Sequence, residues 1–215
     1  MNNPPTVLLS GFEPFGGDHR NSSWDAARGL NDEMIAGHRV VSICLPVTFC
    51  GALPRLFTAI ENHHPALVIA VGQANSRCRI SIERVALNLI DARIADNEGQ
   101  QPIDQPIEAD GPAALFSTLP IKRMYAALRQ AGFPAEISNS AGTFVCNQVF
   151  YGLLRQLPPH LPGGFIHIPY GPEQAADKPG APSMAATLVM DALRHAIEEC
   201  LKPGDDLHFA AGSEC

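Results

Sequence analysis

The sequence contains few of the features that mark membrane, secreted or nucleic-acid-binding proteins. No stretch approaches the roughly 20 apolar residues of a membrane-spanning helix, and the first residues lack the basic start and apolar core of a secretory signal. Lys and Arg total 15 against 22 Asp and Glu, giving a formal net charge of −7, and they never form a run. Such a chain is not attracted to phosphate backbones or anionic lipids. We therefore expect a cytoplasmic protein that binds neither nucleic acid nor membranes.

The cysteines also lack the patterns of metal and disulfide proteins. The chain has six of them, with no C-x-x-C pair and no histidines at the spacing of a zinc site. Disulfide frameworks are typical of much smaller secreted chains, so we interpret these residues as free thiols in a reducing compartment. No metal and no organic cofactor is expected.

The apolar residues predict one α/β domain. A chain of 215 residues with 46% hydrophobic content can build a single large core. Short apolar runs, typical of buried strands, alternate with stretches of helical spacing. This order predicts a three-layer α/β/α fold with a mostly parallel, mixed central sheet. We expect the domain to span residues 1–202 and residues 203–215 to form a polar, frayed tail. The expected strands are 6–12, 38–45, 66–71, 133–138 and 165–168, and the expected helices start near Asn21, Cys50, Pro120, Thr143 and Ser183.

Cys146 stands at the start of a predicted helix. A loop of small residues, 138–143, precedes it, and Thr143 can cap the helix. Free N–H groups and the partial positive charge of a helix start favour a thiolate and can hold an oxyanion. The alternative is core packing, because free cysteine is among the most buried residue types.

Two further residues are candidates for chemistry. The apolar parity of the segment around Glu83 switches at Glu83 and Arg84, which predicts a break in the strand that re-aims Glu83. The alternative for Glu83 is an ion pair with a neighbouring arginine. His167 is predicted near the end of a strand, on the face opposite Ile166 and Ile168. A cysteine nucleophile needs a base such as histidine and a third group that fixes the tautomer of the base, and Glu83 suits the third role.

Two loops complete the list of candidates. Phe12 and Phe15 flank Pro14 in a glycine-containing loop, where they form either a lid on the core or the wall of an apolar pocket. Residues 91–112 have no periodicity over a length that is unusual for a loop in a compact domain. Loops of this kind are usually functional or mobile.

Several blocks of the chain resemble the pyrrolidone-carboxylate peptidase family, also called pyroglutamyl peptidase type I. The resemblance extends over nearly the whole chain, up to about residue 200, with the blocks in family order. The matching blocks are GFEPFGG (11–17), IERVALN (82–88), DARIADNEG (91–99), DGPAALFSTLPIK (110–122), SAGTFVCN (140–147) and GFIHIPY (164–170).

The resemblance implies a phosphorylase/hydrolase-like fold and a cysteine exopeptidase. Its substrates would be peptides with an N-terminal pyroglutamyl residue, which it removes through a thioester intermediate. A neutral lactam ring requires an apolar slot with a few amide hydrogen bonds and no carboxylate-binding arginine. The family also implies a homotetramer. The implied catalytic residues are Glu83, Cys146 and His167, the implied substrate pocket is Phe12, Phe15, Ile94, Phe144 and Val145, and Arg93 is implied in stabilising the oxyanion.

Three positions depart from the family pattern, and the residues are also compatible with three other functions. Ser22 and Ala95 stand where the family usually has proline, and Gln148 stands where histidine is frequent. An amidase or glutaminase using the same residues would release ammonia from free amides. A small-molecule binding protein would not need all three candidate catalytic residues. A role like that of nucleoside phosphorylases rests on fold analogy alone.

Overall fold

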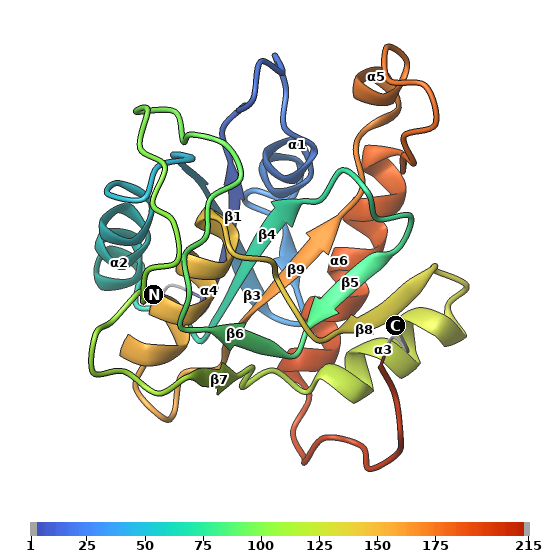
Figure 1. Cartoon of the computed structure of the whole chain (residues 1–215). Coiled ribbons are helices and arrows are strands. Elements are labelled where there is room, and N and C mark those ends of the chain that lie inside the picture. The colour runs from blue at the N-terminus through green and yellow to red at the C-terminus, as the bar shows by residue number, and fades with distance from the viewer. Residues whose placement is uncertain (1–3, 213–215) are drawn as a thin grey trace.

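A seven-stranded sheet, with the order β2-β3-β1-β4-β9-β5-β8, forms the centre of the computed structural model, which describes residues 4–212 (Figure 1). Strands β6 and β7 form a separate two-stranded sheet. The strands are β1 (Thr6–Phe12), β2 (Met34–Ile35), β3 (His38–Leu45), β4 (Leu67–Gln73), β5 (Ile80–Glu83), β6 (Val85–Leu87), β7 (Ala114–Phe116), β8 (Ala135–Ser138) and β9 (Gly163–Ile168).

The strand directions confirm a mixed, mostly parallel sheet. Strands β3, β1, β4 and β9 run parallel to one another, and β5 runs parallel to β8. Strand β5 is antiparallel to β9, as β2 is to β3. The antiparallel pairing of β5 with β9 places Ser81 opposite His167 and Ile82 opposite Ile166.

Helices cover both faces of the sheet, which gives the predicted three layers (Figure 1). Helices α2 and α4 pack on one face, and α1, α3 and α6 pack on the other. The helices are α1 (Ser22–Gly29), α2 (Ala52–His63), α3 (Ile121–Gln130), α4 (Val145–Gln156), α5 (Pro172–Ala175) and α6 (Ala186–Leu201). None of the helices within residues 4–212 has the length and apolar character needed to cross a bilayer.

The central strands are buried on both faces, as continuous apolar runs predict. Along β1, Val7 and Leu9 join the cluster beneath α1, α3 and α6, whereas Leu8 joins the cluster beneath α2 and α4. The two-residue period of a strand therefore divides one run between two cores.

Several element ends differ from the expectation. Strand β4 continues through Gly72 to Gln73, although glycine was expected to end it. Helix α6 begins at Ala186, three residues after Ser183, and no side chain caps it. Helix α1 starts beside Asn21, as expected, and Asn21 caps it by accepting a hydrogen bond from the Ser23 N–H. The chain also breaks between β5 and β6, after Glu83, where the parity switch predicted it.

The loop at residues 91–112 is anchored by a buried carboxylate. Asp96 accepts hydrogen bonds from the backbone N–H groups of Phe49, Glu98 and Gln100. The loop therefore follows a defined path beside the loop that precedes α2.

The segment after α6 lies against α3 in its described part. Asp206 accepts hydrogen bonds from the N–H groups of Lys122 and Arg123, and the Arg123 guanidinium donates to the carbonyls of Pro203 and Gly204. Residues 213–215 lie outside the described residues, and the frayed tail over 203–215 stays a prediction.

Candidate active site

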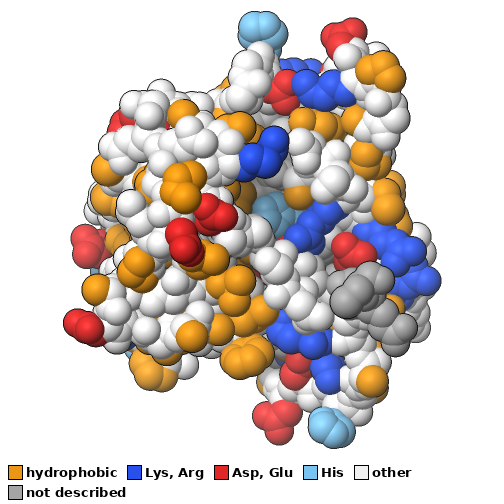
Figure 2. All heavy atoms as spheres, viewed as in Figure 1, with side chains coloured by type: hydrophobic (Ala, Val, Ile, Leu, Met, Phe, Trp, Pro, Cys, Tyr) orange, Lys and Arg blue, Asp and Glu red, His pale blue; other side chains and the backbone are white. Residues whose placement is uncertain are grey.

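The candidate site lies where β1, β4 and β9 end beside the start of α4. Figure 2 shows this part of the surface hollowed near the middle of the view, where the tips of β4 and β9 lie in Figure 1. Parallel strands of an α/β sheet present ligand sites at their carboxyl ends. The location matches the one expected for His167.

Glu83 and His167 form a buried pair. The Nδ1 atom of His167 lies 2.8 Å from Oε1 of Glu83, and the side chains are 5% and 0% exposed. Ser81 stands opposite His167 in the antiparallel register, so Glu83 projects from the same face two residues further along. A carboxylate at this distance accepts the Nδ1 proton and leaves Nε2 free to act as a base.

Arg77 approaches Glu83 from the connection between β4 and β5. Its Nη1 lies 2.8 Å from the same Oε1 atom, and its Nη2 donates to the carbonyl of Ser140 at 2.8 Å. The sequence offered two interpretations of Glu83, an ion pair with an arginine and a contact with the histidine. Both contacts are present, at the same carboxylate oxygen.

Cys146 is the second residue of α4 and lies over Gly72. A Cβ atom added to Gly72 would lie 3.0 Å from the Cys146 sulfur and 2.8 Å from the Phe165 ring. Gly72 is paired with His167 across the parallel ladder, so the sulfur lies over the strand pair that carries the histidine. Any other residue at position 72 would crowd the Cys146 sulfur and the Phe165 ring, so this position requires glycine. The structure thus brings Cys146, His167 and Glu83 into one site.

The start of α4 carries no side-chain cap, contrary to the expectation for Thr143. Phe144 occupies the N-cap position, and the Thr143 hydroxyl donates to the carbonyl of Asp91 instead. The first N–H groups of a helix have no partner within it. At α4 they remain available beside the Cys146 sulfur, where they can bind an oxyanion.

The surroundings of Cys146 act on the pKa of its thiol. Burial raises the pKa of the Cys146 thiol to about 12, the negative charge of Glu83 acts in the same direction, and Arg77 opposes it. Loss of solvation thus works against the expected thiolate. The described contacts include no hydrogen bond from this thiol to His167, so the two must close to hydrogen-bond distance for proton transfer.

A narrow apolar slot, with a free volume of about 10 Å³, lies beside the Cys146 sulfur. Two amide side chains, Asn21 and Gln73, line it. The Oε1 atom of Gln73 accepts hydrogen bonds from the N–H and hydroxyl of Ser22 and from the amide of Gln174, which leaves its Nε2 donor for the pocket. The pocket is lined by Phe12, Phe15, Asn21, Val47, Gln73, Phe144, Val145 and Cys146.

A second, more open pocket shares a wall with this one. Phe15, Gln73 and Phe144 line both pockets, whereas Arg93 and Ile94 line only the outer one. The Phe144 ring packs edge to face on Phe49, with the ring centroids 5.3 Å apart. Of the residues implied for the ring pocket, Phe12, Phe15, Phe144 and Val145 lie in the inner pocket, and Ile94 lies in the outer one.

Sequence reasoning missed several residues that build the site. It did not identify Gly72 or Gln73, and it did not name Arg77 as the partner of Glu83. It also missed Asn147, a fully buried residue that exchanges hydrogen bonds with the backbone of Leu87 and so fastens α4 to β6. The one signal in the sequence for Asn147 was a polar residue directly after the cysteine, within the first turn of the predicted helix.

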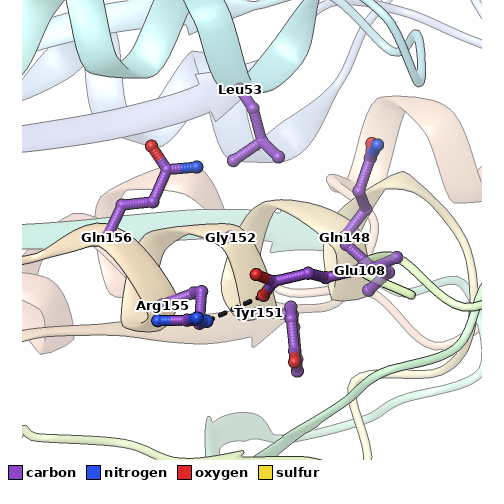
Figure 3. Close-up of a pocket in the computed structure, with 8 residues that line it drawn as sticks. Leu53, Glu108, Gln148, Tyr151, Gly152, Arg155 and Gln156 are labelled. Carbon is purple, nitrogen blue, oxygen red and sulfur yellow. Dashed lines mark hydrogen bonds and ion pairs between the residues drawn. The ribbon is translucent and has the colours of Figure 1, made fainter. Parts of the chain in front are cut away.

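A larger pocket lies on the outer side of α4, facing α2 (Figure 3). Arg155 and Glu108 form an exposed ion pair in it, and the Leu53 side chain points toward it from α2. It is lined by neither Cys146, His167 nor Glu83. Size alone therefore does not identify the functional site.

A cysteine at a helix start, a histidine and a buried carboxylate at one side of an α/β sheet define the site of a cysteine hydrolase. Comparison with known proteins gives the family. A family model described as pyroglutamyl peptidase matches residues 5–203. Pyrrolidone-carboxylate peptidase of Yersinia pestis (strain Pestoides F) is 54% identical over 210 residues, which cover 96% of this chain and 98% of the relative. The chain therefore belongs to the pyroglutamyl peptidase family of cysteine peptidases.

Solved structures agree with this assignment. Pyroglutamyl peptidase I of Bacillus amyloliquefaciens superposes with a TM-score of 0.91 at 45% identity, covering 94% of this chain and 100% of that chain. Pyrrolidone carboxyl peptidase of Thermococcus litoralis also gives 0.91, at 38% identity, with coverage of 96% and 99%. The predicted family and fold class are confirmed.

Proposed function

We propose that this protein is a cysteine exopeptidase that removes the N-terminal pyroglutamyl residue from peptides and proteins. The observation that carries the proposal is the Cys146 sulfur, which lies over Gly72 beside the pair of His167 and Glu83 and at the mouth of an apolar pocket. Family membership supports the same reaction.

The lining of the inner pocket suits a neutral lactam ring, and its walls must move apart to admit the ring. Phe12, Phe15 and Phe144 supply apolar walls, and the Gln73 amide offers a donor for the ring carbonyl. A free N-terminal amino group is charged and would lose its hydration there without a counter-charge. The pocket therefore selects the cyclised N-terminus over an ordinary one.

Acylation starts from the thiol. His167 Nε2 takes the proton of Cys146 as the sulfur attacks the carbonyl that joins pyroglutamate to the next residue. The N–H groups at the start of α4 stabilise the oxyanion that forms on the carbonyl oxygen. The carbon–nitrogen bond then breaks, the leaving amine takes the proton from His167, and a thioester to Cys146 remains.

Deacylation uses the same groups. His167 takes a proton from a water molecule, whose oxygen attacks the thioester carbonyl. The carbon–sulfur bond breaks, the sulfur recovers its proton from His167, and pyroglutamate leaves. Glu83 holds the ring with Nδ1 protonated throughout and stabilises the imidazolium form.

Arg93 is proposed to assist the oxyanion from the outer pocket. Its side chain is exposed and shares that pocket with Phe15 and Phe144, which also wall the inner one. The helix-start N–H groups lie closer to the sulfur, so the contribution of Arg93 is expected to be the smaller of the two.

Further properties follow from the sequence and family resemblance. We propose a single peptidase domain over residues 1–202 that acts in the cytoplasm as a homotetramer without a metal or organic cofactor. Six cysteines without a disulfide or metal-site pattern support a reducing compartment.

Release of a fluorescent amine from a pyroglutamyl amide tests the proposal. Wild-type protein should cleave this substrate under reducing conditions and should leave the matching proline amide intact. Cys146→Ala should abolish the activity in a protein with an unchanged circular dichroism spectrum. Equal activity of Cys146→Ala would contradict the assignment, and release of ammonia from free amides without preference for the lactam would favour a glutaminase.

A further inference from the structure

We propose that Arg77 is a positioning residue that holds the Glu83 carboxylate in place beside His167 and joins the Glu83–His167 pair to the cysteine loop. The inference rests on the proposed function, because it assigns a role within the same catalytic site.

The geometry of Arg77 carries the proposal. One end of its guanidinium, Nη1, lies 2.8 Å from Glu83 Oε1, and the other, Nη2, donates to the Ser140 carbonyl at 2.8 Å. Ser140 belongs to the loop that leads into α4 and Cys146. One planar side chain therefore spans the carboxylate on β5 and the loop that sets the position of the sulfur.

The surroundings of Glu83 explain why it needs a permanent positive charge. Its side chain is 0% exposed, and its Oε2 atom has no hydrogen-bond partner among the described residues. The titratable groups that face it are His167 from β9, Arg77 from the β4–β5 connection and Cys146 from α4. His167 is neutral when it acts as a base, so Arg77 is the lasting counter-charge for this buried carboxylate.

Loss of the Arg77 charge would change which atoms of Glu83 and His167 carry a proton. A buried carboxylate without a positive partner favours its protonated form. A neutral carboxyl can donate to Nδ1 of His167, which moves the ring proton to Nε2 and removes the base. Arg77 therefore fixes the tautomer of a residue that it does not touch.

The same connection carries a matched control. Arg79 stands two residues later, is 54% exposed, and lies 4.0 Å from Glu136. Removing Arg79 takes away the same charge from the same segment without touching Glu83, His167 or the cysteine loop.

The test compares kcat and KM for pyroglutamyl amide over a range of pH in Arg77→Ala, Arg77→Lys and Arg79→Ala. Arg77→Ala should lower kcat roughly 100-fold, an effect of the size expected when a catalytic group is misplaced. Its KM should change much less, and its rate should require a higher pH than wild type. Added guanidinium ion should restore part of the rate, because Arg77 is 20% exposed and the space is reachable from solvent. Arg79→Ala should behave as wild type.

Arg77→Lys keeps the test valid if the alanine variant does not fold. Lysine supplies a charge for Glu83 but not the planar fork to Ser140, so we expect a loss of roughly tenfold with the wild-type pH dependence. A folded Arg77→Ala protein with the kcat of wild type would overturn the inference. A loss that guanidinium does not reverse, with an unchanged pH profile, would also overturn it. Inactive wild-type protein would instead overturn the proposed function.

Discussion

Two arginine–glutamate ion pairs of nearly equal length lie in two regions of the molecule. In the interior site, Arg77 lies 2.8 Å from Glu83, whose side chain is 0% exposed. In the open pocket of Figure 3, Arg155 lies 2.7 Å from Glu108, but the side chains are 48% and 40% exposed. Water and salt screen the second pair and have little access to the carboxylate of the first. Distance therefore does not distinguish the two pairs, whereas burial does.

The partners of each pair differ as well. Glu83 also contacts His167, and Arg77 also binds the cysteine loop, so the interior pair sets the geometry of a reactive site. Glu108 is joined through its backbone to Asn88, so the exposed pair fastens a surface loop to α4. An ion pair therefore acts in catalysis through the groups it holds.

The largest expected effect concerns Cys146 in the interior region. Because burial raises the pKa of this thiol to about 12, its thiolate fraction should rise roughly tenfold per pH unit through neutral and mildly alkaline pH. Alkylation by iodoacetamide, followed by mass spectrometry of the peptide that contains Cys146, measures this rate. The exposed Cys50 provides an internal reference for reagent access. A rate that levels off near neutral pH would show a preformed thiolate and contradict this assignment.

A change at Gly72 should damage the interior site without changing any charge. In Gly72→Ala the new Cβ would collide with the Phe165 ring and the Cys146 sulfur, so we expect kcat to fall roughly 100-fold. Val71→Ala, on the opposite face of the same strand, is the control: it should lower thermal stability but leave kcat unchanged. An active Gly72→Ala protein would show that the sulfur does not need this position.

The apolar wall of the inner pocket should affect recognition more than chemistry. Phe15→Ala removes a ring that lines both pockets and packs near Phe144. Burial of such a side chain contributes about 1.5–3 kcal/mol, so kcat/KM for pyroglutamyl amide should fall roughly 10- to 100-fold, mainly through KM. Phe116→Ala, at a side chain that is 68% exposed on β7, is the control and should leave kinetics as in wild type. Equal kinetics for Phe15→Ala would exclude this pocket as the ring site.

The smallest effect is expected in the exposed region. Arg155→Ala should leave kcat/KM within about twofold of wild type and should change the melting temperature little, because exposed ion pairs contribute little to stability. Steady-state kinetics and a thermal melt measure both quantities. A loss of activity comparable to that of Arg77→Ala would remove the distinction between the two pairs.

Local features of the site were predictable from the sequence, because they depend on residues near one another in the chain. The two-residue period placed His167 opposite Ile166 and Ile168, and the parity switch placed a break after Glu83. Asn21 was predictable as a cap because its short side chain precedes a helical pattern. The family blocks then supplied the roles that these positions hold in relatives.

Features that depend on tertiary contacts were not predictable. The direction of β5 against β9, which brings Glu83 under His167, is set by strand pairing and not by the local pattern. The raised pKa of Cys146 follows from its burial over Gly72, which the sequence could not show. Thr143 was expected to cap α4, but its hydroxyl bonds a carbonyl more than fifty positions away.

The central claim is that Cys146 is the nucleophile of the interior site. Acid quenching of wild-type protein during turnover of a pyroglutamyl amide, followed by peptide mass spectrometry, tests it most directly. We predict a pyroglutamyl group bound as a thioester to the peptide that contains Cys146, and no such adduct in Cys146→Ala. A pyroglutamyl group on another residue, or full turnover by Cys146→Ala without any adduct, would contradict the account.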